Sequence, residues 1–207
     1  MTEMAALITA FTTMFVIIDP PGLAPLYLAL TQGMSSKQRL TIGRRALFTA
    51  GILMLVFLFL GEAVLNFIGV TVPAFRIAGG ILLFPTALDM LFERRQVRRK
   101  SNADGGADPG HDPSVFPLAI PLIVGPGLIT TIILFAGQAK STLDFVAIAG
   151  VMFANLVVVY LFFMVAPSVE RVLGRVGINV VTRVLGMLLA ALAIQFILDG
   201  LRTSGLF

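Results

Sequence analysis

The 207-residue sequence has no cysteine, one histidine and few charged residues, and each shortage excludes a class of chemistry. Without cysteine there is no disulfide, no catalytic thiol and no cysteine metal site. His111 lies in the polar segment 104–114, so neither a histidine triad inside an apolar run nor a multi-histidine metal site can form. Because no nucleophile–base pair or metal cluster remains, we expect neither an enzyme nor a metal or organic cofactor.

Long apolar runs dominate the rest of the chain. Hydrophobic residues make up 57% of it, charged residues only 13%, and the mean hydropathy is +0.98. Runs of about twenty apolar residues can cross a roughly 30 Å hydrocarbon core as helices. The sequence therefore predicts an all-α membrane protein with six transmembrane helices, at residues 4–31, 45–68, 72–92, 115–139, 144–166 and 179–201. The N-terminus lacks the basic start of a cleaved signal peptide, so we expect the first run to be permanent.

Basic residues gather in alternate connections between these runs. The first, third and fifth connections hold 11 of the 15 lysines and arginines, whereas the fourth has only Lys140 and the C-terminal tail only Arg202. Cytoplasmic loops of membrane proteins carry an excess of lysine and arginine, so we place the odd connections in the cytoplasm and both termini on the other side. Because these basic residues orient the protein in the membrane, the pI of about 10.1 does not indicate a nucleic-acid partner.

Residues 93–114 differ in character from the runs on either side. A basic cluster at 94–100 precedes a stretch rich in Gly, Asp and Pro, a composition typical of flexible linkers. The segment divides one membrane domain into two halves, residues 1–92 and 115–207. We expect it to anchor the topology and tether the halves; binding of anionic lipid head groups by the cluster is the alternative.

Two of the apolar runs are interrupted near their middle. Ile18–Leu23 (Ile-Asp-Pro-Pro-Gly-Leu) interrupts the first, and Val124–Leu128 (Val-Gly-Pro-Gly-Leu) interrupts the fourth. Proline lacks the amide donor and clashes with the preceding turn. Backbone groups freed inside hydrocarbon must find partners in protein or in a water-lined cavity. We therefore expect helices 1 and 4 to be discontinuous, each restarting as a half-helix at its proline.

Short sequence matches relate the two halves at offsets of 105 to 107 residues. They pair Pro21-Gly22-Leu23 with Pro126-Gly127-Leu128, Phe67-Ile68-Gly69 with Val172-Leu173-Gly174, and Arg76-Ile77-Ala78-Gly79 with Arg183-Val184-Leu185-Gly186. With three spans in each half, the second half must insert upside down relative to the first. Two inverted three-helix repeats with broken helices are typical of secondary transporters, whose site lies near the bilayer midplane.

The two breaks together predict a substrate site. Half-helix N-termini supply partial positive charge and unpaired amides, which suit an anionic group such as a carboxylate. Glycines permit close backbone approach, and threonine hydroxyls one turn further on add donors. The predicted substrate-binding residues are Asp19, Pro20, Pro21, Gly22, Gly125, Pro126, Gly127, Thr130 and Thr131.

Asp19 has two interpretations. Followed by Pro20, it has the form of an N-cap before proline at the first helical position, and would then only satisfy backbone amides. As a functional carboxylate inside the membrane, it would bind a substrate ammonium or carry a coupling proton or sodium ion. The matching residue of the second half is apolar Val124, an asymmetry that a zwitterionic ligand would require.

Two arginines lie just inside the third and sixth runs. Arg76 and Arg183 either extend their side chains to an interface or form internal ion pairs. The candidate partners are Glu62 for Arg76 and Glu170 for Arg183.

The break motifs carry a family resemblance. Ile18–Pro25 (Ile-Asp-Pro-Pro-Gly-Leu-Ala-Pro) together with Ile120–Gly127 (Ile-Pro-Leu-Ile-Val-Gly-Pro-Gly) resembles the MarC family of bacterial inner-membrane proteins, and the resemblance covers essentially the whole chain. The family is placed near the LysE-type amino-acid exporters. The resemblance implies six spans in an inner membrane, which puts the termini in the periplasm, and transport of glycine- or alanine-like substrates.

The leading hypothesis is a secondary transporter of small neutral amino acids. The ligand carboxylate would lie on the two half-helix N-termini, with Asp19 near the ammonium or the coupling ion. No nucleotide-binding motif is present, so ATP is not expected to act directly on this chain. One alternative is an exporter of other small or amphipathic molecules, with a larger aromatic cavity. The other is a non-transporting membrane module that acts through partners or lipids and whose breaks pack shut.

Overall fold

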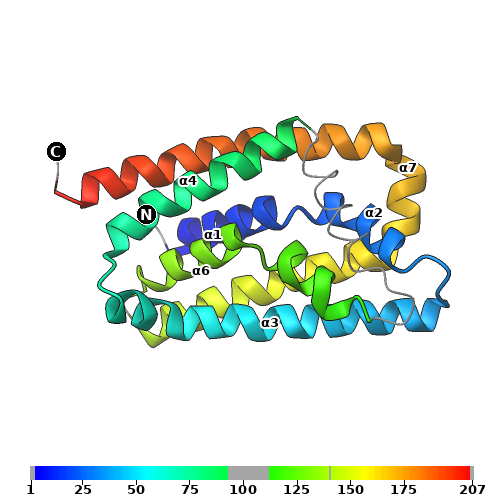
Figure 1. The fold of residues 1–207 in the computed structure, drawn as a ribbon, viewed down its shortest axis with the longest axis horizontal. Coiled ribbons are helices and arrows are strands. Elements are labelled where there is room, and N and C mark those ends of the chain that lie inside the picture. Colours follow the sequence, from blue (N-terminus) through cyan, green and yellow to red (C-terminus); the bar gives the residue numbers. More distant parts are fainter. Residues whose placement is uncertain (1–2, 93–111, 140, 206–207) are drawn as a thin grey trace.

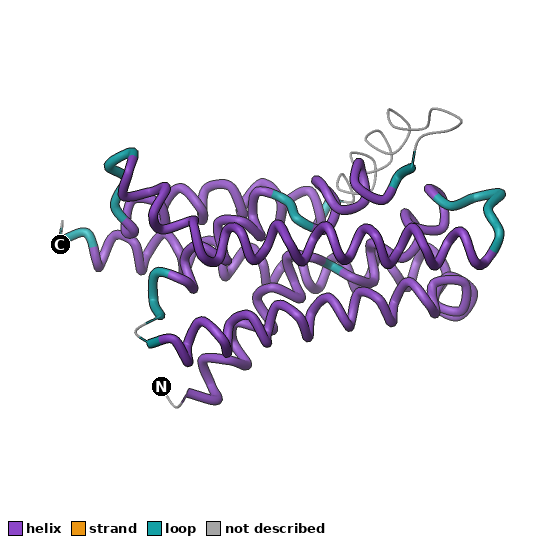
Figure 2. The backbone as a smooth tube through the Cα atoms, turned by 90° about the horizontal axis from the view of Figure 1, so that it is seen from below, coloured by secondary structure: helices purple, strands orange, loops and turns teal. Residues whose placement is uncertain are grey.

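The computed structural model describes residues 3–92, 112–139 and 141–205. Within these ranges the regular structure is entirely helical (Figure 2). Five helices are long and apolar enough to cross a membrane, or six if the bent pair Ser114–Ile123 and Pro126–Ala136 counts as one span. The predicted class of all-α membrane protein is confirmed.

The first half contains four helices: α1 (Glu3–Ile18), α2 (Pro20–Leu30), α3 (Ser36–Phe67) and α4 (Val72–Leu91). Together α1 and α2 form one candidate span, Met4–Leu30. α3 begins well before the apolar run predicted from residue 45, because a capping box starts it. The Gln38 amide donates to Ser35 Oγ at 3.3 Å, and the Ser35 amide donates to Gln38 Oε1 at 3.0 Å.

The second half contains η1 (Ser114–Ile123), α6 (Pro126–Ala136) and α7 (Thr142–Thr203). η1 is a π-helix with non-helical backbone at Phe116 (φ −126°, ψ 126°) and Ile120 (φ −125°, ψ 124°). Each of these residues precedes a proline, whose ring disfavours helical dihedrals at the position before it. Local sequence therefore accounts for the irregular course of η1.

α7 contains the last two predicted spans. It turns at Gly174, whose φ of 59° and ψ of −176° separate two candidate spans, Thr142–Gly174 and Val176–Thr203. The positive φ at this turn favours glycine. The turn falls within the connection predicted at 167–178, but the helix continues through most of that polar stretch, so both spans are longer than predicted. Apolar run length marks the hydrocarbon core, whereas a helix can extend past it into the interface.

The chain runs back and forth along one long bundle. Both termini lie toward the end at which α3 passes into α4, and the α2–α3 connection and the turn of α7 lie at the opposite end (Figure 1). α4 packs along the second part of α7, where glycines let the backbones approach. A Cβ at Gly80 would lie 2.5 Å from the Ala193 carbonyl oxygen, and one at Gly186 would lie 2.9 Å from Met90 Cβ.

Two polar contacts join other helices of the bundle. The Tyr27 hydroxyl donates to the Arg39 carbonyl at 2.7 Å, and its ring stacks on Phe163 with centroids 4.2 Å apart. These contacts link α2, α3 and α7. Asn155 Nδ2 of α7 donates to the Phe11 carbonyl of α1 at 3.4 Å. The predictions for the basic cluster 94–100 and for His111 fall outside the described residues.

Candidate functional site

Two helix junctions lie near the middle of the bundle. We call residues 18–22, where α1 passes into α2, the Asp19 junction, and residues 124–127, where η1 passes into α6, the Gly125 junction. Both lie near the middle of the long axis (Figure 1). A Cβ at Gly127 would lie 3.7 Å from Ile17 Cγ2, so the end of α1 is adjacent to the start of α6. The fold thus brings together the two motifs that the sequence singled out.

Asp19 both ends α1 and begins α2. Its amide donates to the Phe15 carbonyl at 2.9 Å, and its own carbonyl accepts from the Leu23 amide at 3.0 Å. Its φ of 57° and ψ of 64° are left-handed, a conformation that aspartate adopts more readily than most residues. Oδ1 accepts from the Gly22 amide at 3.2 Å, so the predicted N-cap is present. Pro20 and Pro21 have no amide hydrogen, so the first turn of α2 contains two fewer donors that need a partner.

The Asp19 carboxylate is enclosed by both halves of the chain. The residue is 1% exposed. Thr182, in the second part of α7, donates its hydroxyl to Asp19 Oδ1 at 3.4 Å. A Cβ at Gly22 would overlap the carboxylate, so glycine is required for the side chain to fold back onto its cap. An ionisable group buried among apolar spans is expensive, and such groups usually mark functional sites.

The Gly125 junction has the same proline position but different chemistry. η1 and α6 meet at a bend of 62°. Gly125 caps α6 through its backbone alone, its carbonyl accepting from the Leu128 amide at 3.0 Å and the Ile129 amide at 3.1 Å. Val124, at the position that matches Asp19, is a buried apolar residue. This half-helix therefore begins without a carboxylate.

The two predicted threonines are buried in α6. Thr130 Oγ1 donates to the Pro126 carbonyl at 3.0 Å and Thr131 Oγ1 donates to the Gly127 carbonyl at 2.9 Å. The Thr130 methyl group packs against Gly79 of α4, where a Cβ would overlap it. Both hydroxyl hydrogens are thus used within α6, and the oxygens remain as acceptors. Their predicted role as ligand donors requires these hydroxyls to rotate, and stays a prediction.

The remaining charged residues of the predicted site come from α3, α4 and α7, and Arg183 directly follows Thr182, which contacts Asp19. Glu62 of α3 and Arg76 of α4 are half-buried near the end where these helices connect. Arg183 and Glu170, on the two parts of α7, are exposed. The pairing of each arginine with its glutamate stays a prediction.

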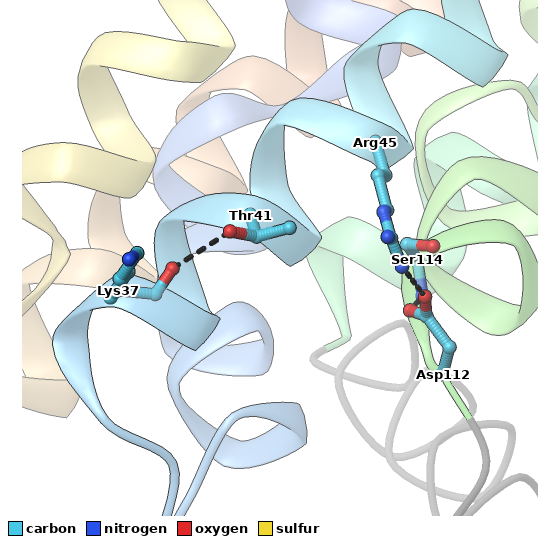
Figure 3. A network of polar contacts seen from close by, with 5 residues as sticks. All are labelled: Lys37, Thr41, Arg45, Asp112 and Ser114. Atoms are coloured by element: carbon cyan, nitrogen blue, oxygen red, sulfur yellow. Dashed lines mark hydrogen bonds and ion pairs between the residues drawn. The ribbon is translucent and has the colours of Figure 1, made fainter.

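An ion pair that the sequence did not indicate links α3 to the start of η1 (Figure 3). Arg45 Nη1 lies 2.7 Å from Asp112 Oδ2, and Asp112 Oδ1 accepts from the Ser114 amide at 3.0 Å. Partial burial raises the pKa of Asp112, but the hydrogen bonds from Ser114 and Arg45 and the charge of Arg45 outweigh it, so the pKa lies below its ordinary value. Sixty-seven residues separate the partners, a distance at which sequence patterns carry no pairing signal.

Sequence reasoning missed Thr182, the residue that contacts Asp19 from the other half. Threonine is common in membrane helices and usually bonds back to its own helix, so it gives no local signal of a long-range contact. Its sequence position, next to the Arg183-Val184-Leu185-Gly186 motif of the internal repeat, is the one feature that points to it.

Taken together, the helical bundle and the buried acid at a helix junction define an integral membrane protein of several spans. The chain belongs to the MarC family: the family model described as MarC family integral membrane protein matches residues 4–204. This confirms the resemblance carried by the two break motifs.

Relatives match over nearly their whole length. A UPF0056 membrane protein of Archaeoglobus fulgidus is 36% identical, covering 93% of this chain and 90% of its own. The UPF0056 membrane protein YhcE of Escherichia coli is 33% identical, covering 93% of this chain and 90% of its own. A UPF0056 membrane protein of Methanocaldococcus jannaschii is 32% identical, with 94% and 95% covered. These names identify membrane proteins and state no substrate. No solved structure matches the chain.

Proposed function

We propose that this protein is a secondary transporter of small neutral amino acids, glycine- or alanine-like, with the substrate held between the Asp19 and Gly125 junctions. The observation that carries the proposal is the Asp19 carboxylate, 1% exposed, at a helix start in the middle of the bundle. A structural cap alone does not require an acid, because serine, threonine or asparagine caps a helix as well without a charge to bury. A buried charge is better explained by a ligand or an ion.

The proposal includes two inverted three-helix repeats with discontinuous first helices. Support comes from the crossing of α4 with the second part of α7. Gly80 packs against Ile197, where a Cβ would lie 2.6 Å from Cγ1, and Gly186 packs against Met90. At the repeat offset of 107 residues, Gly80 corresponds to residue 187, next to Gly186. Met90 corresponds to Ile197 at the same offset. Exchange of the two halves therefore carries one of these contacts to within one residue of the other, which supports an internal two-fold axis.

The difference between the junctions orients a zwitterion. The N-terminus of α2 already holds the Asp19 carboxylate, whereas α6 begins without a side-chain cap. A substrate carboxylate therefore belongs at the start of α6, where amides and the helix dipole favour an anion. The substrate ammonium, or a coupling proton or sodium ion, belongs at Asp19. A Cβ at residue 22 or 127 would overlap Asp19 or Leu83, so the space beside these glycines is already filled in this structure.

Transport requires at least one further conformation. Asp19, Gly22 and Gly127 are buried, whereas Gly125 is half-buried and Pro126 is exposed, so the buried residues of the two junctions must open to admit a ligand. Rocking of one repeat against the other would open them in turn. Because the chain has no nucleotide-binding motif, an ion gradient or exchange would drive the cycle.

Uptake into proteoliposomes tests the proposal. Purified protein reconstituted with an imposed proton or sodium gradient should take up labelled glycine or alanine, and unlabelled substrate inside should stimulate exchange. Asp19→Asn should lower the rate at least about tenfold, the expected loss of one charge-assisted contact. Glu170→Gln, which removes an exposed acid, is the matched control and should leave the rate unchanged.

Two outcomes would count against different parts of the proposal. Absence of uptake and exchange for every small neutral amino acid would overturn the transport function. Full uptake by Asp19→Asn at every pH would retain transport but reduce Asp19 to a helix cap.

The proposed orientation places the protein in an inner membrane with both termini in the periplasm. It rests on the excess of Lys and Arg in the odd connections. A C-terminal alkaline phosphatase fusion, active only in the periplasm, should be active; a cytoplasmic C-terminus would leave it inactive and reverse the orientation.

A further inference from the structure

A groove outside the junctions opens between α3 and the first part of α7. It has a volume of about 560 Å³ and is lined almost entirely by apolar side chains. Gly51 and Leu156 form its half-buried floor, where a Cβ on the glycine would lie 3.3 Å from Leu156 Cδ1. Phe48 and Phe153, both largely exposed, form its rims. Glycine at position 51 therefore lets Leu156 pack close to the backbone of α3 at the floor of the groove.

The groove has one polar end. Arg44 and Tyr160 lie among its lining residues, and Leu55 and Phe153 line it farther along the two helices. The α3 residues from Arg44 to Leu55 span about 16 Å, which is about half of a roughly 30 Å hydrocarbon core. Arg44 directly precedes the apolar part of α3, so it lies near an interface. The groove therefore extends through one leaflet, from head-group level to the bilayer middle.

Arg44 is available to an anion, whereas its neighbour is not. Among the described residues the Arg44 guanidinium has no hydrogen-bond or ion-pair partner, and the residue is exposed. Arg45 is paired with Asp112 at 2.7 Å. Consecutive residues of a helix point about 100° apart, so the two arginines serve different faces of α3.

We infer that this groove is a binding site for one anionic phospholipid, with an acyl chain along Gly51 and the head-group phosphate on Arg44. The length of the groove, its apolar walls and its single cation at the head-group end match one lipid of that leaflet. Tyr160 adds an amphipathic side chain of the kind enriched near membrane interfaces. A second protein copy is a weaker candidate, because apolar surface in lipid gives no hydrophobic drive for helix association.

The absence of tryptophan from the chain makes single-tryptophan reporters available. Leu55 lines the groove and Val56 does not, yet both are 42% exposed and adjacent on α3. Leu55→Trp and Val56→Trp should be reconstituted in phosphatidylcholine vesicles that contain brominated phosphatidylglycerol or, separately, the same fraction of brominated phosphatidylcholine. Fluorescence quenching at Leu55→Trp should show an about fivefold preference for the anionic lipid, and Val56→Trp none.

Two further substitutions in the Leu55→Trp background assign the preference. Arg44→Gln should abolish it, whereas Arg45→Gln should leave it unchanged. Equal preference at both tryptophans, or a preference that survives Arg44→Gln, would overturn the inference. The inference would also be overturned if neither brominated lipid quenched Leu55→Trp and the protein could be cross-linked as a dimer, because a second copy would then fill the groove.

Native mass spectrometry provides a second measurement that needs no tryptophan. The unmodified protein released from detergent with phosphatidylglycerol should retain one more lipid than Arg44→Gln, and should retain no extra phosphatidylcholine. Equal retention of phosphatidylglycerol by the two proteins would contradict the inference even if the reporter variants failed to fold.

Discussion

The Asp19 and Gly125 junctions share a proline at the start of the following helix but solve the break differently. At Asp19 the last backbone hydrogen bond of α1 and the first of α2 share this one residue, its carboxylate caps the new helix, and Met4–Leu30 remains one candidate span. At Gly125 the backbone alone caps the new helix, and the chain bends by 62°. A left-handed capping residue can join two helices in line, whereas a π-helix that ends in extended backbone cannot.

The chemical consequence follows from the caps. α2 begins with its donors satisfied internally by an anion, and α6 begins with no side-chain acceptor. One junction therefore offers a negative group and the other offers partial positive charge. The two matched motifs have become complementary rather than equivalent, and the following substitutions test that difference.

The largest effect is expected from Asp19→Ala. It removes the cap, leaves the Thr182 donor unpaired and places alanine at φ 57°, so the free energy of unfolding should fall by about 3 kcal/mol. Asp19→Asn keeps the cap and tolerates the left-handed backbone, so it should cost less than about 1 kcal/mol. Equilibrium unfolding in mixed SDS micelles measures both. Equal losses would mean that the charge, not the cap, stabilises this junction.

Gly22→Ala and Gly127→Ala compare matched glycines. The new methyl group at residue 22 overlaps the Asp19 carboxylate and displaces the cap, which should cost about 2 kcal/mol. At residue 127 it lies 2.6 Å from Leu83 Cδ2, the end of a side chain that can move, so the cost should be about 1 kcal/mol. The same unfolding assay ranks them. A larger loss at residue 127 would show that helix packing, not the cap, limits substitution.

Thr182→Val removes the donor that reaches Asp19 from α7. The buried carboxylate loses a hydrogen bond at 3.4 Å, which should lower the unfolding free energy by about 1 kcal/mol. Thr131→Val is the control, because its hydroxyl bonds only to Gly127 of its own helix, and it should cost about 0.5 kcal/mol or less. In a double-mutant cycle with Asp19→Asn, Thr182→Val should couple and Thr131→Val should not. Additive effects for both threonines would contradict the contact.

The smallest effect concerns the Arg45–Asp112 pair ahead of the Gly125 junction, which has no counterpart among the described residues ahead of Asp19. The pKa of Asp112 is lower in the folded protein, so its stabilisation is present above the ordinary carboxyl pKa. It is lost as the pH falls through the lowered value. Both groups are largely exposed, at 64% and 43%, so Asp112→Asn should cost only about 0.5 kcal/mol at neutral pH.

The pH dependence provides the check on this last pair. The difference in unfolding free energy between wild type and Asp112→Asn should shrink as the pH is lowered through the acid range. Glu170→Gln, which removes an exposed acid outside this pair, serves as the comparison. A difference that grows on acidification would reverse the assigned sign.

Several features of the fold were predictable because their causes are local. Run length and hydropathy gave nearly all the spans, since the hydrocarbon thickness sets the length of a helix that crosses it. The helix starts at Pro20 and Pro126 follow from the geometry of proline, and the Asp19 cap follows from its position before one. The helical parts of the 167–178 connection and the early start of α3 were not predicted, because polar residues can also be helical.

By itself, the sequence determined that the chain is an all-α membrane protein and where two of its apolar runs change direction or restart. These properties depend on transfer free energies and on backbone sterics within a few residues. Only the tertiary structure decided that Thr182 meets Asp19, that η1 bends away from α6, and that Arg44 faces a groove while Arg45 faces Asp112. Such contacts join residues far apart in the chain, and they form only when whole helices pack in one register.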